Sequence, residues 1–251
     1  MPAPGEIAHA ESLLAQAAGG GAVAAVQLRK LAGACDFFTA LGDDELGRRA
    51  HEQLSAQGVR VHSTNVDEPQ RRALVFLDAA GERTITVVGE RLVPKRADPL
   101  PWEQLGSADG VYFTGGDVGA LRAARAARVL VATPRTLATL RGSGVELDAL
   151  VGSATDPGET YTPGDVDPPP RLRIATTGAD GAVADPGGPF AAAALPGAFQ
   201  DAYGAGDSFA AGLTYGLTAG WGTDEAVSLA ARCGAAAVTG RGAFEGQLTL
   251  P

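Results

Sequence analysis

The stretch Asp201-Ala202-Tyr203-Gly204-Ala205-Gly206-Asp207-Ser208-Phe209 places two glycines and an aspartate where a loop turns into a helix. Gly204 and Gly206 have no Cβ atom, so the backbone can turn tightly there and approach a ligand closely. The amides of residues 204–207 would face one concavity at a helix N-terminus, an arrangement that binds anions. With the Asp207 carboxylate as a base beside this cradle for negative charge, the stretch meets the needs of phosphoryl transfer to a hydroxyl. A plain tight turn with a helix cap is the structural alternative.

The residues that follow predict a helix over 208–218. Phe209, Leu213 and Leu217 recur four residues apart and form one apolar stripe. A second stripe at the same spacing consists of glycines at positions 212, 216 and 220. Because a glycine inside a helix costs about 1 kcal/mol, this stripe indicates close packing against a sheet or another helix.

Composition restricts the class of protein. The chain has 251 residues, enough for one large domain or two small ones, and 45% of them are hydrophobic, which is typical of a globular protein. No apolar run approaches the roughly 20 residues that span a bilayer, and no secretory signal is visible. A net charge of −9 argues against a nucleic-acid or anionic-membrane partner. It leaves a nucleotide ligand open, because local amides can bind phosphate.

Cysteine and histidine usage points in the same direction. Cys35 and Cys233 are far apart and form no Cys-x-x-Cys pair, which argues against a zinc site and a disulfide framework and favours the cytoplasm. The three histidines are scattered, and we interpret them as ordinary surface or loop residues.

Apolar strands alternate with helical stretches through the second half of the chain. Strands are predicted at 111–114, 128–133, 147–152 and 171–176, and helices at 120–128 and 134–140. This order predicts a mostly parallel sheet covered on both faces, with ligands bound beyond the carboxyl ends of its strands.

One segment departs from this alternation. Residues 72–78 and 82–89 predict two strands joined by Ala79-Ala80-Gly81, which is a hairpin signal. Both faces of the first strand are apolar, so we expect one face to cover something and the other to pack. An ordinary hairpin on the main sheet is the alternative.

The opening stretch resembles the C-terminal signature of the PfkB (ribokinase-like) carbohydrate kinases, roughly Asp-Thr-x-Gly-Ala-Gly-Asp-x-Phe, with Ala202 in place of the threonine. The resemblance extends from about Pro4 to Gln247. It implies a three-layer α/β/α fold with a mostly parallel central sheet and a small β-sheet lid that often makes a dimer contact. We expect residues 16–60 and 95–251 to form the main nucleotide- and substrate-binding domain, and residues 1–15 and 61–94 to form the lid.

The resemblance also implies roles for particular residues. Asp207 takes the proton from the acceptor hydroxyl, and the amides of Gly204, Ala205 and Gly206 hold the transferring phosphoryl group. Gly19, Gly20 and Gly21 match the family's N-terminal glycine loop, which contacts the acceptor. The Asn that usually follows this loop is replaced by Val23 or Ala24, which removes a polar contact to the acceptor.

The nucleotide is expected at two further places. Thr176, Gly178 and Gly181 resemble the family's Thr-x-Gly-x-x-Gly turn against the nucleotide, with an ordinary turn as the alternative. Gly234 lies on the last long helix, whose equivalent lines the adenine pocket. In the segment from Gly42 to Gly47 we prefer a helix cap by Asp43 or Asp44.

The resemblance also implies metal binding at two places. Residues 153–156 occupy the place of an Asn-x-x-Glu motif that helps to organise Mg²⁺ and phosphate, but both of its end positions differ. Asp156 could still orient a metal-bound water, and Glu159 could substitute for it. Asp201 and the loop 240–243 match regions that hold a monovalent cation such as K⁺ in several relatives.

The start of the chain departs from the family. Relatives begin with a strand that binds acceptor hydroxyls, and residues 1–6 here resemble the segment after it. Either the start codon is misassigned or the protein has repaired the gap.

The sequence predicts an ATP-dependent kinase for a hydroxyl of a small sugar or sugar-like acceptor. A non-catalytic nucleotide- or sugar-binding regulatory relative is the alternative, favoured by the missing strand, the lost Asn and the altered Asn-x-x-Glu motif.

Overall fold

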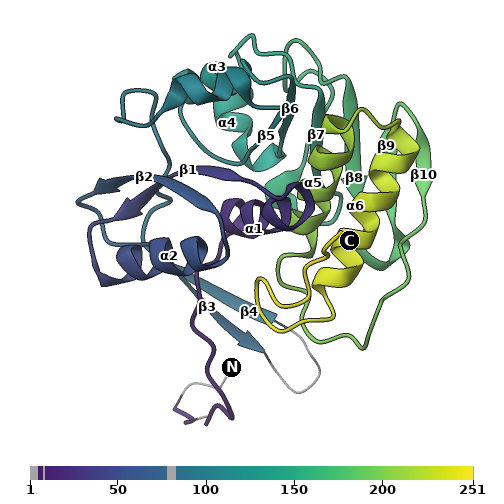
Figure 1. Cartoon of the computed structure of the whole chain (residues 1–251). Coiled ribbons are helices and arrows are strands. Elements are labelled where there is room, and N and C mark those ends of the chain that lie inside the picture. The colour runs from purple at the N-terminus through teal and green to yellow at the C-terminus, as the bar shows by residue number, and fades with distance from the viewer. Residues whose placement is uncertain (1–4, 8, 78–82, 251) are drawn as a thin grey trace.

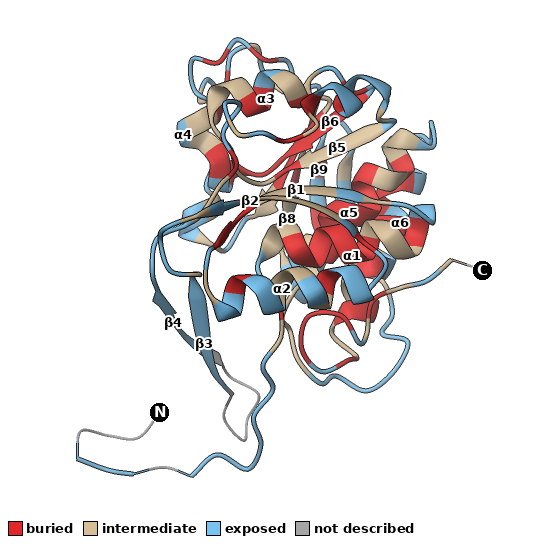
Figure 2. Cartoon of the chain, turned by 60° about the vertical axis from the view of Figure 1, so that its left-hand side comes forward, coloured by how far each residue is buried: buried red, intermediate tan, exposed pale blue. Residues whose placement is uncertain are grey.

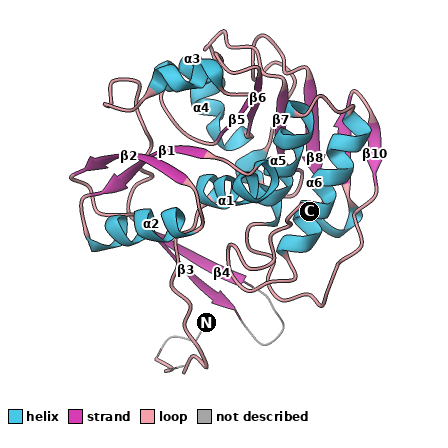
Figure 3. Cartoon of the chain, in the orientation of Figure 1, coloured by secondary structure: helices cyan, strands magenta, loops and turns pink. Residues whose placement is uncertain are grey.

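The protein is described from a computed structural model, which covers residues 5–7, 9–77 and 83–250. Helices lie on both sides of the strands (Figure 3). The helices are α1 (Gly20–Ala32), α2 (Glu45–Ala56), α3 (Val118–Ala124), α4 (Leu137–Leu140), α5 (Ala205–Thr218) and α6 (Thr223–Ala237), and the 3-10 turns are η1 (Trp102–Ser107), η2 (Pro134–Thr136), η3 (Pro157–Glu159) and η4 (Gly178–Asp180). The strands are β1 (Asp36–Gly42), β2 (Arg60–Val66), β3 (Arg72–Leu77), β4 (Arg83–Val88), β5 (Gly110–Phe113), β6 (Val129–Ala132), β7 (Ala149–Ser153), β8 (Leu172–Thr176), β9 (Ala182–Asp185) and β10 (Gly188–Phe190).

The largest sheet has six strands in the order β10-β9-β8-β7-β6-β5. Strands β5 to β8 run parallel to one another, whereas β9 runs antiparallel to both of its neighbours, β8 and β10. Because β5 to β8 are parallel, their carboxyl ends lie together at one edge of the sheet. The ribokinase-like α/β fold predicted from the sequence is confirmed, with a central sheet that is mixed at one end.

Both faces of this sheet are buried, and β6 shows how its sequence achieves this. Leu130 packs in the cluster that contains α3 and α4, whereas Val129 and Val131 pack in the cluster that contains α5 and α6. Successive side chains of a strand point to opposite faces, so an unbroken apolar run suits a strand covered on both sides. In Figure 1, α3 and α4 lie toward the top of the molecule and α5 and α6 toward the right.

The glycine stripe of α5 packs against α6. A Cβ atom at Gly212 would lie 2.8 Å from the sulfur of Cys233, and one at Gly216 would lie 2.8 Å from Cα of Ala226. The close packing predicted from the stripe is therefore confirmed for Gly212 and Gly216. Gly220 lies beyond the end of α5, and a Cβ atom there would meet nothing within 4 Å. Cys233 is fully buried in this contact and acts as a small core residue.

A second, two-stranded sheet pairs β1 with β2 in parallel and is covered by α2. Asp44 caps α2, because its Oδ1 accepts a hydrogen bond of 2.8 Å from the Gly47 amide, and its Oδ2 accepts one of 2.9 Å from the Gln70 amide. These bonds, with the Gly47 amide foremost, lower the pKa of Asp44. The predicted cap is confirmed for Asp44.

The projecting hairpin consists of β3 and β4, with Leu74 opposite Thr86. Figure 2 shows it extending from the body as an exposed ribbon. Within the predicted lid segment 61–94, β2 pairs with β1, and β3 pairs with β4 to form the hairpin. The division into a main domain and a lid stays a prediction. The described residues of the predicted segment 1–15 contain no strand, and the connection Ala79-Ala80-Gly81 lies outside the described residues. In the part of the chain that the structure covers, no helix is both long and apolar enough to cross a bilayer.

Both faces of the hairpin carry apolar side chains that this chain leaves uncovered. Phe76 is 44% exposed and Ile85 is 48% exposed. We expect the hairpin to pair two copies of the chain, so that sedimentation at micromolar concentration gives a dimer and Phe76→Asp gives a monomer. The control is Val183→Asp, which places the same charge at an exposed apolar residue of β9. A wild-type chain that sediments only as a monomer contradicts the prediction.

Candidate active site

The motif at 201–209 forms the N-terminus of α5. Gly204 is the N-cap with a left-handed φ of 78°, and a Cβ atom there would lie 2.9 Å from Cγ1 of Val23. A Cβ atom at Gly206 would meet nothing within 4 Å, so the first turn of the helix faces open space. The helix N-terminus is therefore accessible to an anion. The helix dipole and the amides of the first turn would attract one.

The N-terminal glycine loop lies directly against this helix. A Cβ atom at Gly20, the first residue of α1, would lie only 2.5 Å from Oδ1 of Asp207. The amide of Gly19 donates a hydrogen bond of 2.9 Å to the hydroxyl of Tyr203. Two loops about 180 residues apart thus form one site, with the Asp207 carboxylate between them.

Residues of β1 and of the segment after β5 also lie against the glycine loop. A Cβ atom at Gly21 would lie 3.0 Å from the ring of Phe37 on β1 and 3.1 Å from Oγ1 of Thr114, which follows β5. Val23 and Ala24 stand where the family has its Asn, and both are buried. Val23 packs against Gly204 of the motif and has no polar side-chain atom to offer a ligand. Sequence reasoning missed Tyr203 and Thr114, since neither stands out without its distant partner.

The environment of Asp207 changes its acidity. Burial raises the pKa of Asp207 to about 6; the nearby Glu159 carboxylate adds to the rise, and the guanidinium groups of Arg135 and Arg91 oppose it. Arg91 follows β4 and donates a hydrogen bond to the carbonyl of Thr114. A carboxylate whose pKa lies near the working pH is suited to accept a proton and release it again.

This pKa predicts the pH dependence of turnover. Asp207 accepts a proton only when it is ionised, so we expect kcat/KM to rise about tenfold per pH unit below the pKa of about 6 and to level off above about pH 7. Buffer-matched kcat/KM measurements between pH 4.5 and 8.5 test this, because kcat/KM reports the pKa of the ligand-free protein. An ordinary aspartate, with a pKa near 3.8, would give a flat profile over most of that range. A flat profile would therefore count against Asp207 as the base.

The residues predicted to contact the nucleotide lie at the carboxyl ends of β7 and β8. Thr176 ends β8 and pairs in register with Ser153 at the end of β7. Gly178 opens the turn η4 with a φ of 66°, and a Cβ atom at Gly181 would lie 2.0 Å from the carbonyl oxygen of Phe190. Close packing and a positive φ of 102° therefore both require glycine at position 181, without reference to a nucleotide.

Gly234 on α6 lies beneath the start of α5. A Cβ atom there would lie 3.3 Å from the carbonyl oxygen of Ala205 and 3.6 Å from Cβ of Phe209. The small residue lets α6 approach the anion-facing turn of α5. Its contact with a nucleotide stays a prediction.

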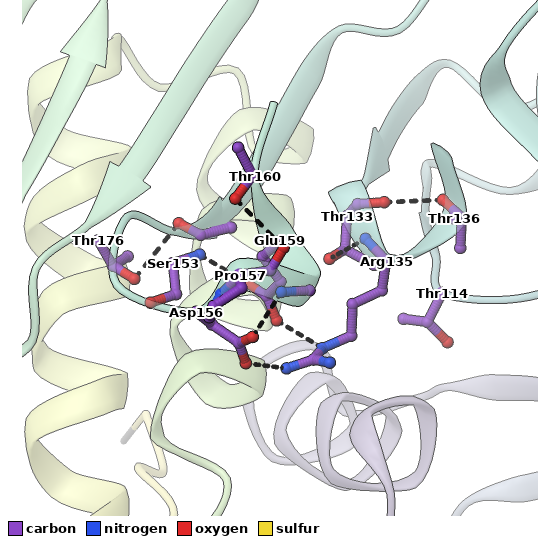
Figure 4. Close-up of polar contacts among 12 residues, drawn as sticks. Thr114, Thr133, Arg135, Thr136, Ser153, Asp156, Pro157, Glu159, Thr160 and Thr176 are labelled. Atoms are coloured by element: carbon purple, nitrogen blue, oxygen red, sulfur yellow. Dashed lines mark hydrogen bonds and ion pairs between the residues drawn. The ribbon is translucent and has the colours of Figure 1, made fainter. Parts of the chain in front are cut away.

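The predicted metal ligands Asp156 and Glu159 meet an arginine (Figure 4). Nη2 of Arg135 lies 2.5 Å from Oδ2 of Asp156, and Nε of Arg135 lies 2.6 Å from Oε1 of Glu159. The Gly158 amide, and then Arg135, hold the pKa of Asp156 below its usual range. Arg135 went unnoticed in the sequence, although its place just after β6 is where ligands bind in parallel sheets.

This arrangement does not fit a divalent ion held by the protein. The described residues contain no group of three histidine, cysteine or acidic side chains able to hold a metal. A guanidinium group occupies the space between the two carboxylates, where an ion would need their oxygens.

Asp201 lies apart from this pair. Its Oδ1 accepts a hydrogen bond of 2.9 Å from the Tyr203 amide, and its Oδ2 accepts one of 3.3 Å from the Gly242 amide. Asp201 therefore joins the motif to the loop 240–243. A monovalent cation there stays a prediction.

Comparison with known structures places this fold. A ribokinase from Thermotoga maritima has a TM-score of 0.76 at 20% identity, over 98% of this chain and 89% of that one. A ribokinase from Arabidopsis thaliana, complexed with ribose and ATP, has a TM-score of 0.72 at 22% identity, over 99% and 90%. An adenosine kinase from Sinorhizobium meliloti has a TM-score of 0.67 at 21% identity, over 89% and 78%. A search of the curated proteins returned no match.

Fold and site together define a ribokinase-like α/β protein. The pfkB family carbohydrate kinase model matches residues 2–134 and 138–249. The chain belongs to this family.

Proposed function

We propose that the protein transfers the γ-phosphoryl group of ATP to a hydroxyl of a small sugar or sugar-like acceptor. The observation that carries this proposal is the position of the Asp207 carboxylate, which lies against Gly20 of the glycine loop and in the first turn of α5. A base and an anion-binding helix N-terminus thus converge at one place. Phosphoryl transfer needs little more from a protein than such positioning and charge stabilisation.

In the proposed step, Asp207 accepts the proton of the acceptor hydroxyl as its oxygen attacks the γ-phosphorus in line. A new bond forms between that oxygen and phosphorus, and the bond from phosphorus to the β–γ bridging oxygen breaks. ADP leaves with the electron pair, and the proton stays on Asp207 until solvent removes it. The amides of Gly204, Ala205 and Gly206 stabilise the charge on the phosphoryl oxygens.

Exclusion of water is the role we assign to the hairpin β3–β4. Water competes with the acceptor hydroxyl for the phosphoryl group, so a cover over the site favours transfer over hydrolysis. The apolar, exposed faces of the hairpin suit such a cover.

The class of acceptor is supported by the relatives. One similar structure is a ribokinase complexed with ribose and ATP, and another is an adenosine kinase. Pentoses and nucleosides are therefore the first acceptors to test. The experiment measures ADP release from purified protein with ATP against a panel of sugars, nucleosides and vitamin alcohols.

A non-catalytic nucleotide- or sugar-binding relative is the second candidate. Two observations favour it: Arg135 engages both acidic side chains of the altered motif, and Val23 and Ala24 are buried and apolar. Against it, binding alone needs no base beside the anion site. Nucleotide binding without ADP release on any acceptor would favour this candidate, whereas phosphorylated product from one acceptor would exclude it.

A further inference from the structure

Arg135 is held firmly at the carboxyl end of the sheet. Its backbone lies in η2, directly after β6, where the Thr133 hydroxyl accepts a hydrogen bond of 3.4 Å from the Arg135 amide. The Thr136 hydroxyl donates one of 2.7 Å to the carbonyl of Thr133 and fixes the same turn. The guanidinium group is therefore anchored from a rigid element rather than from a long loop (Figure 4).

The two carboxylates that hold Arg135 are fixed in turn by backbone amides. Glu159 accepts a hydrogen bond of 2.6 Å from the Ser153 amide, and Asp156 accepts one of 2.8 Å from the Gly158 amide. Each acid thus has one oxygen on the backbone and the other on the arginine. Such double support leaves little freedom for the carboxylates to turn toward an added metal ion.

The guanidinium group still has capacity for a ligand. Nε and Nη2 make the two ion pairs, whereas Nη1 donates to no acceptor among the described residues. The Arg135 side chain is 48% exposed, so an incoming anion can reach it. Arg135 also lies close enough to Asp207 for its charge to act on that carboxylate.

We propose that Arg135 is the fixed cation of this site and binds the phosphate chain of the nucleotide in the absence of a metal ion held by the protein. The hydrogen-bond donors of arginine form a planar fork that matches phosphate oxygens. Its positive charge stabilises a phosphoryl group during transfer. The acidic pair then serves to orient the arginine. This inference rests on the proposed function in so far as the anion is a nucleotide.

The test compares wild type with Arg135→Gln, Arg135→Lys and the control Arg141→Gln. Arg141 also forms an exposed ion pair with an aspartate, 2.6 Å from Asp165, but outside the site. Binding of ATP is measured by calorimetry in EDTA, without divalent ions. We expect an affinity about tenfold to a hundredfold weaker in Arg135→Gln, a smaller loss in Arg135→Lys and no change in Arg141→Gln.

A second measurement uses Mn²⁺ alone, followed by electron paramagnetic resonance without nucleotide. We expect no bound Mn²⁺ in wild type or Arg141→Gln, and a bound ion in Arg135→Gln, where both carboxylates lose their cation. Tight Mn²⁺ binding by wild type, or undiminished ATP binding by Arg135→Gln, would overturn the proposal. If wild type binds ATP but phosphorylates no acceptor, the proposed function fails, while these binding data still decide the role of Arg135.

Discussion

Asp207→Asn should lower kcat by about a thousandfold and at the same time stabilise the protein at pH 8. An amide cannot accept the proton of the acceptor hydroxyl, and general base catalysis contributes about 10²–10⁴-fold to a rate. The fold should persist, because Asn has nearly the same size as Asp and the α5 N-terminus keeps its amides. Steady-state ADP release measures the loss.

The gain in stability follows from the sign of the pKa shift. Folding raises the pKa of Asp207 from 3.8 to about 6, so the folded state binds a proton more tightly than the unfolded state. Between these two pH values ionisation begins to cost folding free energy, and above about pH 6 the full cost remains. Two pKa units at about 1.4 kcal/mol each give a cost of roughly 3 kcal/mol. Asp207→Asn should therefore melt at a higher temperature than wild type at pH 8, and the difference should vanish near pH 4.

The control for this experiment is Asp109→Asn. Asp109 is 80% exposed, pairs with Arg128 and precedes β5 at the opposite end of the sheet. An exposed pair of this kind contributes little to stability, so we expect neither turnover nor melting temperature to change. Near wild-type turnover in Asp207→Asn would refute the role of Asp207 as base.

Gly20→Ala should lower kcat by about a hundredfold without unfolding the protein. The new Cβ atom would lie 2.5 Å from Oδ1 of Asp207, closer than two such atoms can approach, so the carboxylate must turn away from its position. Misplacement of a reacting group by about 1 Å can cost 10²-fold in rate. Circular dichroism melting should show a folded protein, since alanine favours the first turn of α1 more than glycine does.

Two comparisons separate this mechanism from general damage. Gly106→Ala, whose Cβ atom would meet nothing within 4 Å, should leave turnover unchanged. In an Asp207→Asn background, Gly20→Ala should add almost no further loss, because the carboxylate it displaces no longer acts as a base. Independent losses that multiply in the double variant would show that Gly20 acts elsewhere.

The local features of this protein were predictable from the sequence. The strands β5 to β8 follow from short apolar runs, and the cap of α2 follows from an aspartate three residues before Gly47. Gly204 is a glycine because the chain adopts a left-handed φ of 78° where the loop turns into α5. In each case the physical cause acts within a few residues, so the pattern is visible along the chain.

Predictions were less complete where one segment contacts another. Residues 61–94 were assigned to one lid segment, and the sequence did not reveal that β2 pairs with β1 while β3 pairs with β4. The apolar or alternating sequence of a strand does not determine which other strand it pairs with, because the same periodicity is compatible with any neighbour in a sheet.

The sequence by itself determined the α/β class, the helix N-terminus at 204–207 and the acidic residue beside it. Only the tertiary structure decided that Gly20 lies against Asp207 and that Arg135 lies between Asp156 and Glu159. These contacts join residues that are 21 or more positions apart and depend on the order of strands in the sheet. The spacing of apolar residues along the chain does not determine the strand order, since long-range contacts arise from the packing of whole helices and strands.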